Sequence, residues 1–203
     1  ELAIRTYVES YFNSPDSLVK AGIARAGNVI GGGDWAENRI IPDCVKAWSK
    51  NEIVRVRNPN STRPWQHVLE PLSGYLSLGS YLNKKEKQDG SAYNFGPKED
   101  QDRSVSDLIN EMQKYWDKVN WESDQLDDNK KFKEAKLLKL NCDKSLEVFN
   151  WRPILSFEET IKLTAEWYKT YYDRLDDNTF NLSIKQLNYY SDTAKLRGLK
   201  WAQ

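Results

Sequence analysis

One stretch decides the fold: Ala24-Arg25-Ala26-Gly27-Asn28-Val29-Ile30-Gly31-Gly32-Gly33-Asp34. It reads as a short apolar strand that runs into a glycine cluster. Glycines and an asparagine directly after a strand expose backbone N–H groups and an amide at the strand's carboxyl end. In an open α/β sheet, ligands bind outside the carboxyl ends of the strands. We therefore expect a ligand site here, within an α/β fold whose few strands are separated by helices.

Two further segments belong to the same expected site, Asn38-Arg39-Ile40-Ile41-Pro42 and Ser61-Thr62-Arg63-Pro64-Trp65-Gln66-His67-Val68-Leu69-Glu70. The amide of Asn28 is suited to a phosphate or a sugar hydroxyl, and Gly27 would let a flat ring approach the backbone. Asn38 and Arg39 begin a predicted helix, where free N–H groups favour an anion. Arg63 lies on a stiff backbone before proline and suits forked contacts with a diphosphate.

Each of these features has a simpler interpretation. The glycines 31–33 are also expected of an ordinary loop, and Arg63 of an ordinary surface arginine. His67 precedes an apolar helix, which favours a structural or capping role over that of a base. Arg55 and Arg57 are placed to frame a base near Trp48, or else they protect a sheet edge. The glycines match neither a phosphate-binding loop nor a dinucleotide fingerprint.

Periodicity predicts helices over 1–13, 40–49, 68–82, 104–116, 143–149 and 156–172, and strands over 19–26, 53–56, 92–97 and 136–140. The helix 68–82 is expected to bury an apolar face, and its members are Leu72, Tyr75, Leu76, Leu78 and Leu82. A polar loop is expected from 121 to 131. Residues 174–203 are polar and weakly periodic, around Phe180, Leu182, Ile184 and Leu187. We expect two parts, a body over 1–173 and a tail over 174–203 that docks on the body or on another subunit.

The composition excludes several classes of function. Lysine plus arginine and aspartate plus glutamate number 30 each, so no overall charge favours nucleic acid or an acidic membrane. Two cysteines and one histidine support neither a disulfide framework nor a metal site. No apolar run has the length of a membrane span, and no signal peptide is recognised. A cytoplasmic setting is the default expectation.

The chain resembles the CDP-glucose 4,6-dehydratases, which are extended short-chain dehydrogenase/reductases. The resemblance lies in the glycine stretch up to Trp35, in 38–43, and in Thr62-Arg63-Pro64-Trp65-Gln66-His67-Val68-Leu69-Glu70-Pro71. It continues in Ala92-Tyr93-Asn94-Phe95-Gly96-Pro97, 138–141, Trp151-Arg152-Pro153 and 164–168. It implies the last part of a Rossmann-type sheet together with the smaller mixed α/β domain that binds substrate.

The resemblance implies removal of water from CDP-glucose to give CDP-4-keto-6-deoxyglucose, with a tightly held NAD. Hydride would leave C4, water would be lost across C5–C6, and the hydride would return to C6. Ala26 and Gly27 would border the nicotinamide. The residues that would bind substrate are Asn28, Asn38, Arg39, Arg57, Arg63, Asn94 and Glu134.

The resemblance also implies where the chemistry is done. The family's glycine-rich dinucleotide loop, acidic pair and Tyr-x-x-x-Lys pair would precede Glu1, so this chain alone is expected not to turn over CDP-glucose. The family tends to place a histidine ahead of Glu134, where this chain has Lys133. A homo-oligomer is expected for the full-length protein. A 4-epimerase of the same superfamily and a non-catalytic nucleotide-sugar-binding domain are the alternatives.

Overall fold

The computed structural model describes residues 1–14, 16–84, 90–98, 103–124, 140–173 and 179–203. Its helices are α1 Leu2–Tyr7, η1 Val8–Phe12, α2 Ile40–Ser49, α3 Leu69–Lys84, α4 Val105–Gln113, α5 Asp143–Phe149, α6 Phe157–Asp173, α7 Thr179–Leu196 and η4 Lys200–Ala202. Its strands are β1 Ile23–Ala26, β2 Asn28–Ile30, β3 Val54–Val56, β4 Thr62–Arg63, β5 Trp65–His67, β6 Ala92–Phe95, β7 Arg103–Ser104 and β8 Trp121–Ser123.

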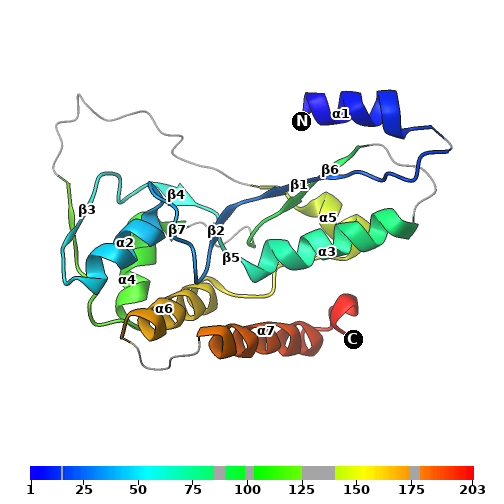
Figure 1. Ribbon diagram of the computed structural model, residues 1–203. Coiled ribbons are helices and arrows are strands. Elements are labelled where there is room, and N and C mark those ends of the chain that lie inside the picture. The colour runs from blue at the N-terminus through cyan, green and yellow to red at the C-terminus, as the bar shows by residue number, and fades with distance from the viewer. Residues whose placement is uncertain (15, 85–89, 99–102, 125–139, 174–178) are drawn as a thin grey trace.

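Strands β1 and β6 form a parallel pair in which Ala26 lies opposite Phe95. Helix α3 covers one face of this pair so closely that a Cβ on Gly74 would lie 2.3 Å from Cδ1 of Phe95. Helix α5 packs on the same face, with the Phe149 ring 4.7 Å from that of Tyr93. In Figure 1, α3 and α5 lie below the strands and α1 lies above them.

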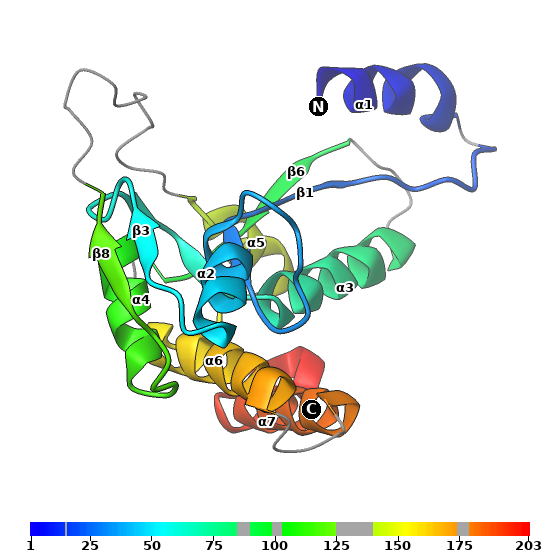
Figure 2. The ribbon, with the colours of Figure 1, turned by 60° about the vertical axis from the view of Figure 1, so that its left-hand side comes forward.

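The second part of the fold is built from three more two-stranded pairs. Pairs β2–β5 and β3–β8 are parallel, and β4–β7 is antiparallel. Helices α2, α4 and α6 gather around them, as the turned view in Figure 2 shows. Their core is aromatic and aliphatic, with Trp48, Trp116 and Tyr168 fully buried. Because β2 follows β1 after one residue, the two parts of the fold meet at Gly27.

Local signals in the sequence place several helices correctly. Helices α2 and α5 begin and end as predicted. At the start of α4, the Ser104 side chain accepts from the Asp107 N–H, and the Asp107 carboxylate accepts from the Ser104 N–H. The predicted capping box at α6 is also present, since the Ser156 N–H donates to Glu159 Oε2 at 2.7 Å.

Other expectations are wrong. Helix α3 buries Leu78 as expected, but it leaves Leu72 and Leu76 46% and 77% exposed, and its other buried residues are Glu70, Pro71, Ser73 and Gly74. Of these, Gly74 faces Phe95 of β6, where a Cβ would lie 2.3 Å from Cδ1 of the ring. The strand predicted over 19–26 is limited to Ile23–Ala26, where only Ile23 is buried. Residues Trp121–Ser123, expected in a polar loop, form β8 beside β3. The strand predicted over 136–140 lies outside the described residues except for its last position.

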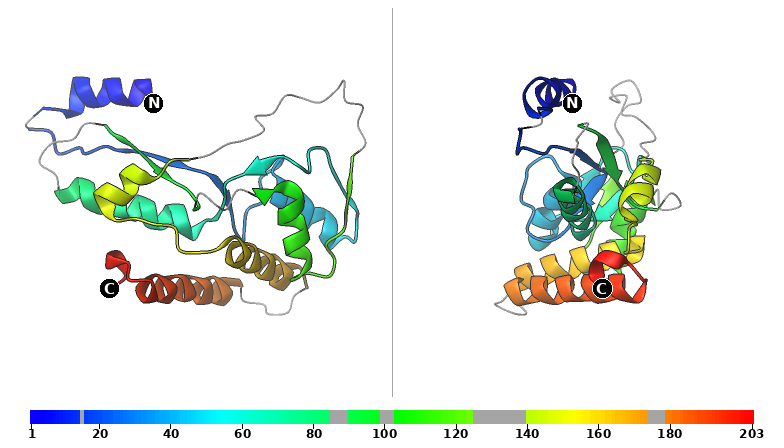
Figure 3. Two further views of the ribbon diagram at one scale, coloured as in Figure 1. Left: turned by 180° about the vertical axis from the view of Figure 1, so that it is seen from behind. Right: turned by 90° about the vertical axis from the view of Figure 1, so that its right-hand side faces the viewer.

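Helix α7 occupies most of the expected tail and packs along α6, below α3 (Figure 3). It is buried through Gln186, Tyr190 and Ala194. Of the periodic positions in the sequence, Phe180, Ile184 and Leu187 are exposed. The buried face of α7 is therefore a polar and small-residue face, which hydrophobic periodicity does not detect.

Candidate functional site

The β1–β2 junction brings Ala26, Gly27 and Asn28 to the carboxyl end of the β1–β6 pair. The Asn28 N–H donates to the Pro64 carbonyl at 3.1 Å. A Cβ on Gly27 would lie 2.8 Å from that same carbonyl oxygen. Gly27 is therefore required for the close approach of two backbones, and the space beside it holds Pro64. On that side of the chain the space is occupied by Pro64, and the expected approach of a flat ring to Gly27 stays a prediction.

We call Ala26, Gly27, Asn28 and Arg63 the strand-end group; Arg63 lies on β4, just before β5. Asn28 lies opposite Trp65, two residues beyond Arg63. Across β4–β7, Arg63 lies directly opposite Arg103. The Arg103 guanidinium lies over the Phe157 ring, 5.7 Å from its centroid, and Arg63 Nη1 donates to the Thr62 carbonyl at 2.8 Å. Arg103 was not among the residues expected in the site, because the pairing of 62–63 with 103–104 has no local signal in the sequence.

Gln66 is a second residue that sequence reasoning did not select. Its side chain is 1% exposed, and its Nε2 donates to the Phe95 carbonyl at 2.9 Å. This bond ties the end of β6 to β5, so Gln66 joins the two parts of the fold at the site. Its Oε1 is buried and has no hydrogen-bond partner in the part of the chain that the structure describes. The signal in the sequence was a glutamine in the middle of an otherwise aromatic strand.

Asn94 is held by neighbouring protein groups. Its Nδ2 donates to the Asn141 carbonyl at 2.7 Å, and its Oδ1 accepts from Arg25 at 3.3 Å. Arg25 in turn contacts the carboxylate of Glu1 at 2.6 Å. Asn94 precedes Phe95, so it borders the strand-end group from the other face of the β1–β6 pair.

The remaining expected residues lie further out. Asn38 has a left-handed backbone, with φ 62°, and Arg39 is the N-cap residue of α2. The Arg39 guanidinium is 64% exposed and lies 3.3 Å from Asp34. Arg57 is exposed and follows β3, in the separate β3–β8 pair. Glu134, like Lys133, lies outside the described residues.

His67 has the features of a structural residue. It is 2% exposed, and its Nδ1 accepts from the Leu69 N–H at 3.4 Å, at the start of α3. Burial lowers the pKa of His67 to about 4, so the ring is neutral at pH 7. This geometry favours the capping interpretation over that of a base.

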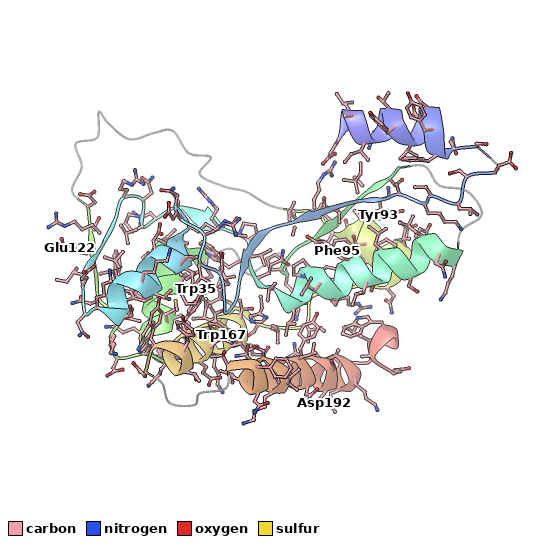
Figure 4. The ribbon with its side chains drawn as sticks, in the orientation of Figure 1. Trp35, Tyr93, Phe95, Glu122, Trp167 and Asp192 are labelled. Carbon is pink, nitrogen blue, oxygen red and sulfur yellow. The ribbon has the colours of Figure 1, made fainter. Side chains whose placement is uncertain are left out.

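The glycine cluster packs under aromatic rings. A Cβ on Gly32 would lie 2.1 Å from the Trp167 ring, and Gly33 has φ +80°. Trp35 and Trp167, both labelled in Figure 4, lie with centroids 6.3 Å apart, and Tyr171 stacks on Trp167. The loop interpretation of these glycines therefore agrees with the structure. Some of the many aromatic residues form this partly exposed cluster.

Three further observations concern chemistry. A Tyr-x-x-x-Lys spacing does occur, at Tyr81 to Lys85, but the Tyr81 ring packs against Tyr93 and Phe149. Because α3 leads on to the start of β6, Tyr81 lies at the amino ends of the strands, away from the site. Over the described ranges, no three His, Cys, Asp or Glu residues gather as metal ligands. The described helices include none long and apolar enough to cross a membrane.

Comparison with known proteins shows what most of this chain is similar to. The CDP-glucose 4,6-dehydratase of Salmonella typhimurium (strain LT2) is 38% identical over 176 residues, spanning 84% of this chain and 48% of that protein. The resemblance to CDP-glucose 4,6-dehydratase is confirmed. No family model matches the chain.

Solved structures show the same fold. UDP-glucose-4-epimerase from Stenotrophomonas maltophila, with bound NAD and formylated UDP-arabinopyranose, has a TM-score of 0.67 at 13% identity, over 85% of this chain and 54% of that one. The dTDP-glucose 4,6-dehydratase of Bacillus anthracis, in complex with NAD, has a TM-score of 0.61 at 17% identity, over 83% and 49%. The fold is that of the extended short-chain dehydrogenase/reductases, as expected. The chain spans about half the length of these relatives.

Proposed function

We propose that this chain supplies the substrate-binding side of a CDP-glucose 4,6-dehydratase, which converts CDP-glucose to CDP-4-keto-6-deoxyglucose. The observation that carries the proposal is the strand-end group: the β2–β5 pairing places Asn28 beside the segment that holds Arg63. An amide and a guanidinium at the carboxyl ends of strands suit a sugar linked to a diphosphate. The 38% identity to a dehydratase of that name supports this choice of substrate.

The roles proposed for the side chains follow from their chemistry. Arg63 binds the diphosphate, assisted by Arg103 across the β4–β7 pair. Asn28 donates to the sugar or to the diphosphate. The other residues proposed to surround the substrate are Asn38, Arg39, Arg57, Asn94 and Glu134.

NAD is the proposed cofactor, because the solved relatives named above contain it. Ala26 ends β1 with a small side chain, and it is proposed to border the nicotinamide end of the cofactor together with Gly27. When bound, NAD supplies the transient acceptor for a hydride. What this chain contributes is the backbone edge at 26–28, which orients the substrate beside that ring. We also propose that the full-length enzyme is a cytoplasmic homo-oligomer.

The first test is Arg63→Ala, with CDP affinity measured by calorimetry. Losing a charge-assisted hydrogen bond is worth about 1.5–3 kcal/mol, so affinity should fall about ten- to a hundredfold. Arg55→Ala is the matched control, since Arg55 pairs with Glu122 at 2.6 Å on an exposed strand. Equal affinities for the wild-type chain and Arg63→Ala would remove Arg63 from the site.

A 4-epimerase is the second candidate, favoured by the fold shared with UDP-glucose-4-epimerase. The two activities differ in their products. A dehydratase loses water and yields a 4-keto-6-deoxy sugar, whereas an epimerase yields an isomer of unchanged mass. Mass spectrometry of the product made by the full-length enzyme distinguishes them. A non-catalytic domain would bind the nucleotide sugar and release it unchanged.

A further inference from the structure

We propose that Glu70 and Tyr190 are positioning residues, through which helix α7 holds the β5–α3 corner in the geometry that binds the nucleotide sugar. The corner is defined as residues 63–70, from Arg63 to Glu70. The effect on ligand affinity rests on the function proposed above, whereas the effect on the corner itself does not.

The Glu70 side chain is the centre of a buried hydrogen-bond network. It is 1% exposed, and its Oε1 accepts from the Ile154 and Leu155 N–H groups at 2.7 and 2.6 Å. Its Oε2 accepts from the Tyr190 hydroxyl at 2.9 Å. Three segments far apart in the sequence thus meet at one carboxylate: the first turn of α3, the loop before α6, and α7.

A second polar group extends the network. The Tyr190 hydroxyl lies 2.8 Å from Ser73 Oγ, which also accepts from the Trp151 Nε1 at 2.9 Å. Ser73 lies one turn after Glu70 on the same helix. Tyr190 as a whole is 2% exposed. Its hydroxyl therefore bridges two side chains of α3 inside the core. Buried polar groups of this kind are costly to leave without partners, so each one specifies the position of the others.

The network acts directly on the corner. The Val68 N–H donates to the Ile30 carbonyl at 2.8 Å, which fixes the end of β5 to β2. Two residues later, Glu70 fixes the first turn of α3 to α7 and to the 154–155 backbone. Between the two anchors, only Leu69 intervenes, so a shift of the first turn is transmitted to β5. Gln66 and Arg63 lie immediately before this point on the same chain segment.

The rest of α7 is attached elsewhere. Gln186 Nε2 donates to the Leu163 carbonyl at 2.8 Å, and Ser183 Oγ accepts from the Trp167 Nε1 at 3.0 Å. Both partners belong to α6. Removing the Tyr190 hydroxyl therefore breaks the hydrogen bonds to α3, while the ring's apolar packing and the attachments to α6 stay in place.

The test is Tyr190→Phe, with Tyr189→Phe as the matched control. Tyr189 is the next residue, and its hydroxyl donates to Glu159 at 2.8 Å on the exposed side of α7. Each substitution removes one hydroxyl. In the Tyr190→Phe chain, we expect the Val68, Ile154 and Leu155 amides to exchange hydrogen about five- to tenfold faster, while those of α4 keep their rates. CDP affinity should fall about three- to tenfold.

The outcomes separate the two proposals. Faster exchange confined to the corner supports the positioning role, even if neither protein binds CDP, in which case only the proposed function fails. Exchange that rises equally in α4 and in the corner would show general destabilisation and overturn the inference. Unchanged exchange in Tyr190→Phe, or an equal effect in Tyr189→Phe, would also overturn it. If wild-type chain binds CDP and Tyr190→Phe binds it equally well, the positioning of the site is refuted.

Discussion

A methyl group added at Gly74 is expected to destabilise the chain by about 1–3 kcal/mol, the usual cost of overpacking a core. The Cβ would lie 2.3 Å from Cδ1 and 2.6 Å from Cε1 of Phe95, a buried ring that the 1% exposed Trp151 also contacts. The ring cannot withdraw without moving β6. The difference between the urea unfolding midpoints of Gly74→Ala and the wild-type chain measures this cost.

Gly79→Ala is the control, because it lies on the same helix and its Cβ would meet nothing within 4 Å. There the gain in helix propensity acts alone, and stability should rise by about 0.5–1 kcal/mol. Gly74→Ala should also weaken CDP binding, since the Phe95 carbonyl anchors Gln66 at the site. Equal midpoints for the two variants would contradict the close packing of α3 on β6.

Removing the Glu70 carboxyl group, as in Glu70→Ala, is expected to cost about 2–4 kcal/mol. Two backbone N–H groups and the Tyr190 hydroxyl would lose their acceptor inside the core. Glu70→Gln keeps the shape and one carbonyl acceptor, so it should cost far less. Urea midpoints at pH 6 give both values. If Glu70→Ala and Glu70→Gln are equally stable, the buried network does not hold the corner.

The wild-type chain and Glu70→Gln together test a pH dependence. Burial raises the pKa of Glu70 from 4.5 to about 7, although its hydrogen bonds oppose the shift. The folded chain then binds the proton more strongly than the unfolded chain, so the stability from this group is greatest below about pH 4.5. It is lost as the pH rises to 7, by up to about 3 kcal/mol. Wild-type chain should lose more stability between pH 5 and pH 8 than Glu70→Gln, and parallel profiles would contradict this shift.

The helices with local signals were predictable from the sequence. Capping residues at Ser104 and Ser156 mark where α4 and α6 begin, because an N-cap is a contact between neighbours in the chain. Asn28 and Arg63 could be selected as candidates, since an asparagine after a strand and an arginine before proline are local features; their role in binding stays a prediction. That Asn28 lies beside the segment carrying Arg63 depends on the β2–β5 pairing, in which Asn28 is opposite Trp65.

What the sequence did not predict depends on pairing between distant segments. Arg103 lies opposite Arg63 only because β7 pairs with β4, and Trp121–Ser123 is a strand only because β3 lies beside it. Hydrophobic periodicity placed Leu72 and Leu76 on the buried face of α3, whereas the close packing on Phe95 is made by Gly74. Tyr190 was missed for a similar reason, because its burial is set by a hydrogen bond to Glu70.

The most direct test of the central claim is a titration of the chain with CDP-glucose, followed by hydrogen exchange of the saturated complex. The account predicts saturable heat, together with slower exchange at 26–28 and 62–66, where Asn28 and Arg63 lie. Excess CDP should reverse both effects. An absence of binding, or protection confined to segments away from these strand ends, would contradict the assignment of this surface as the nucleotide-sugar site.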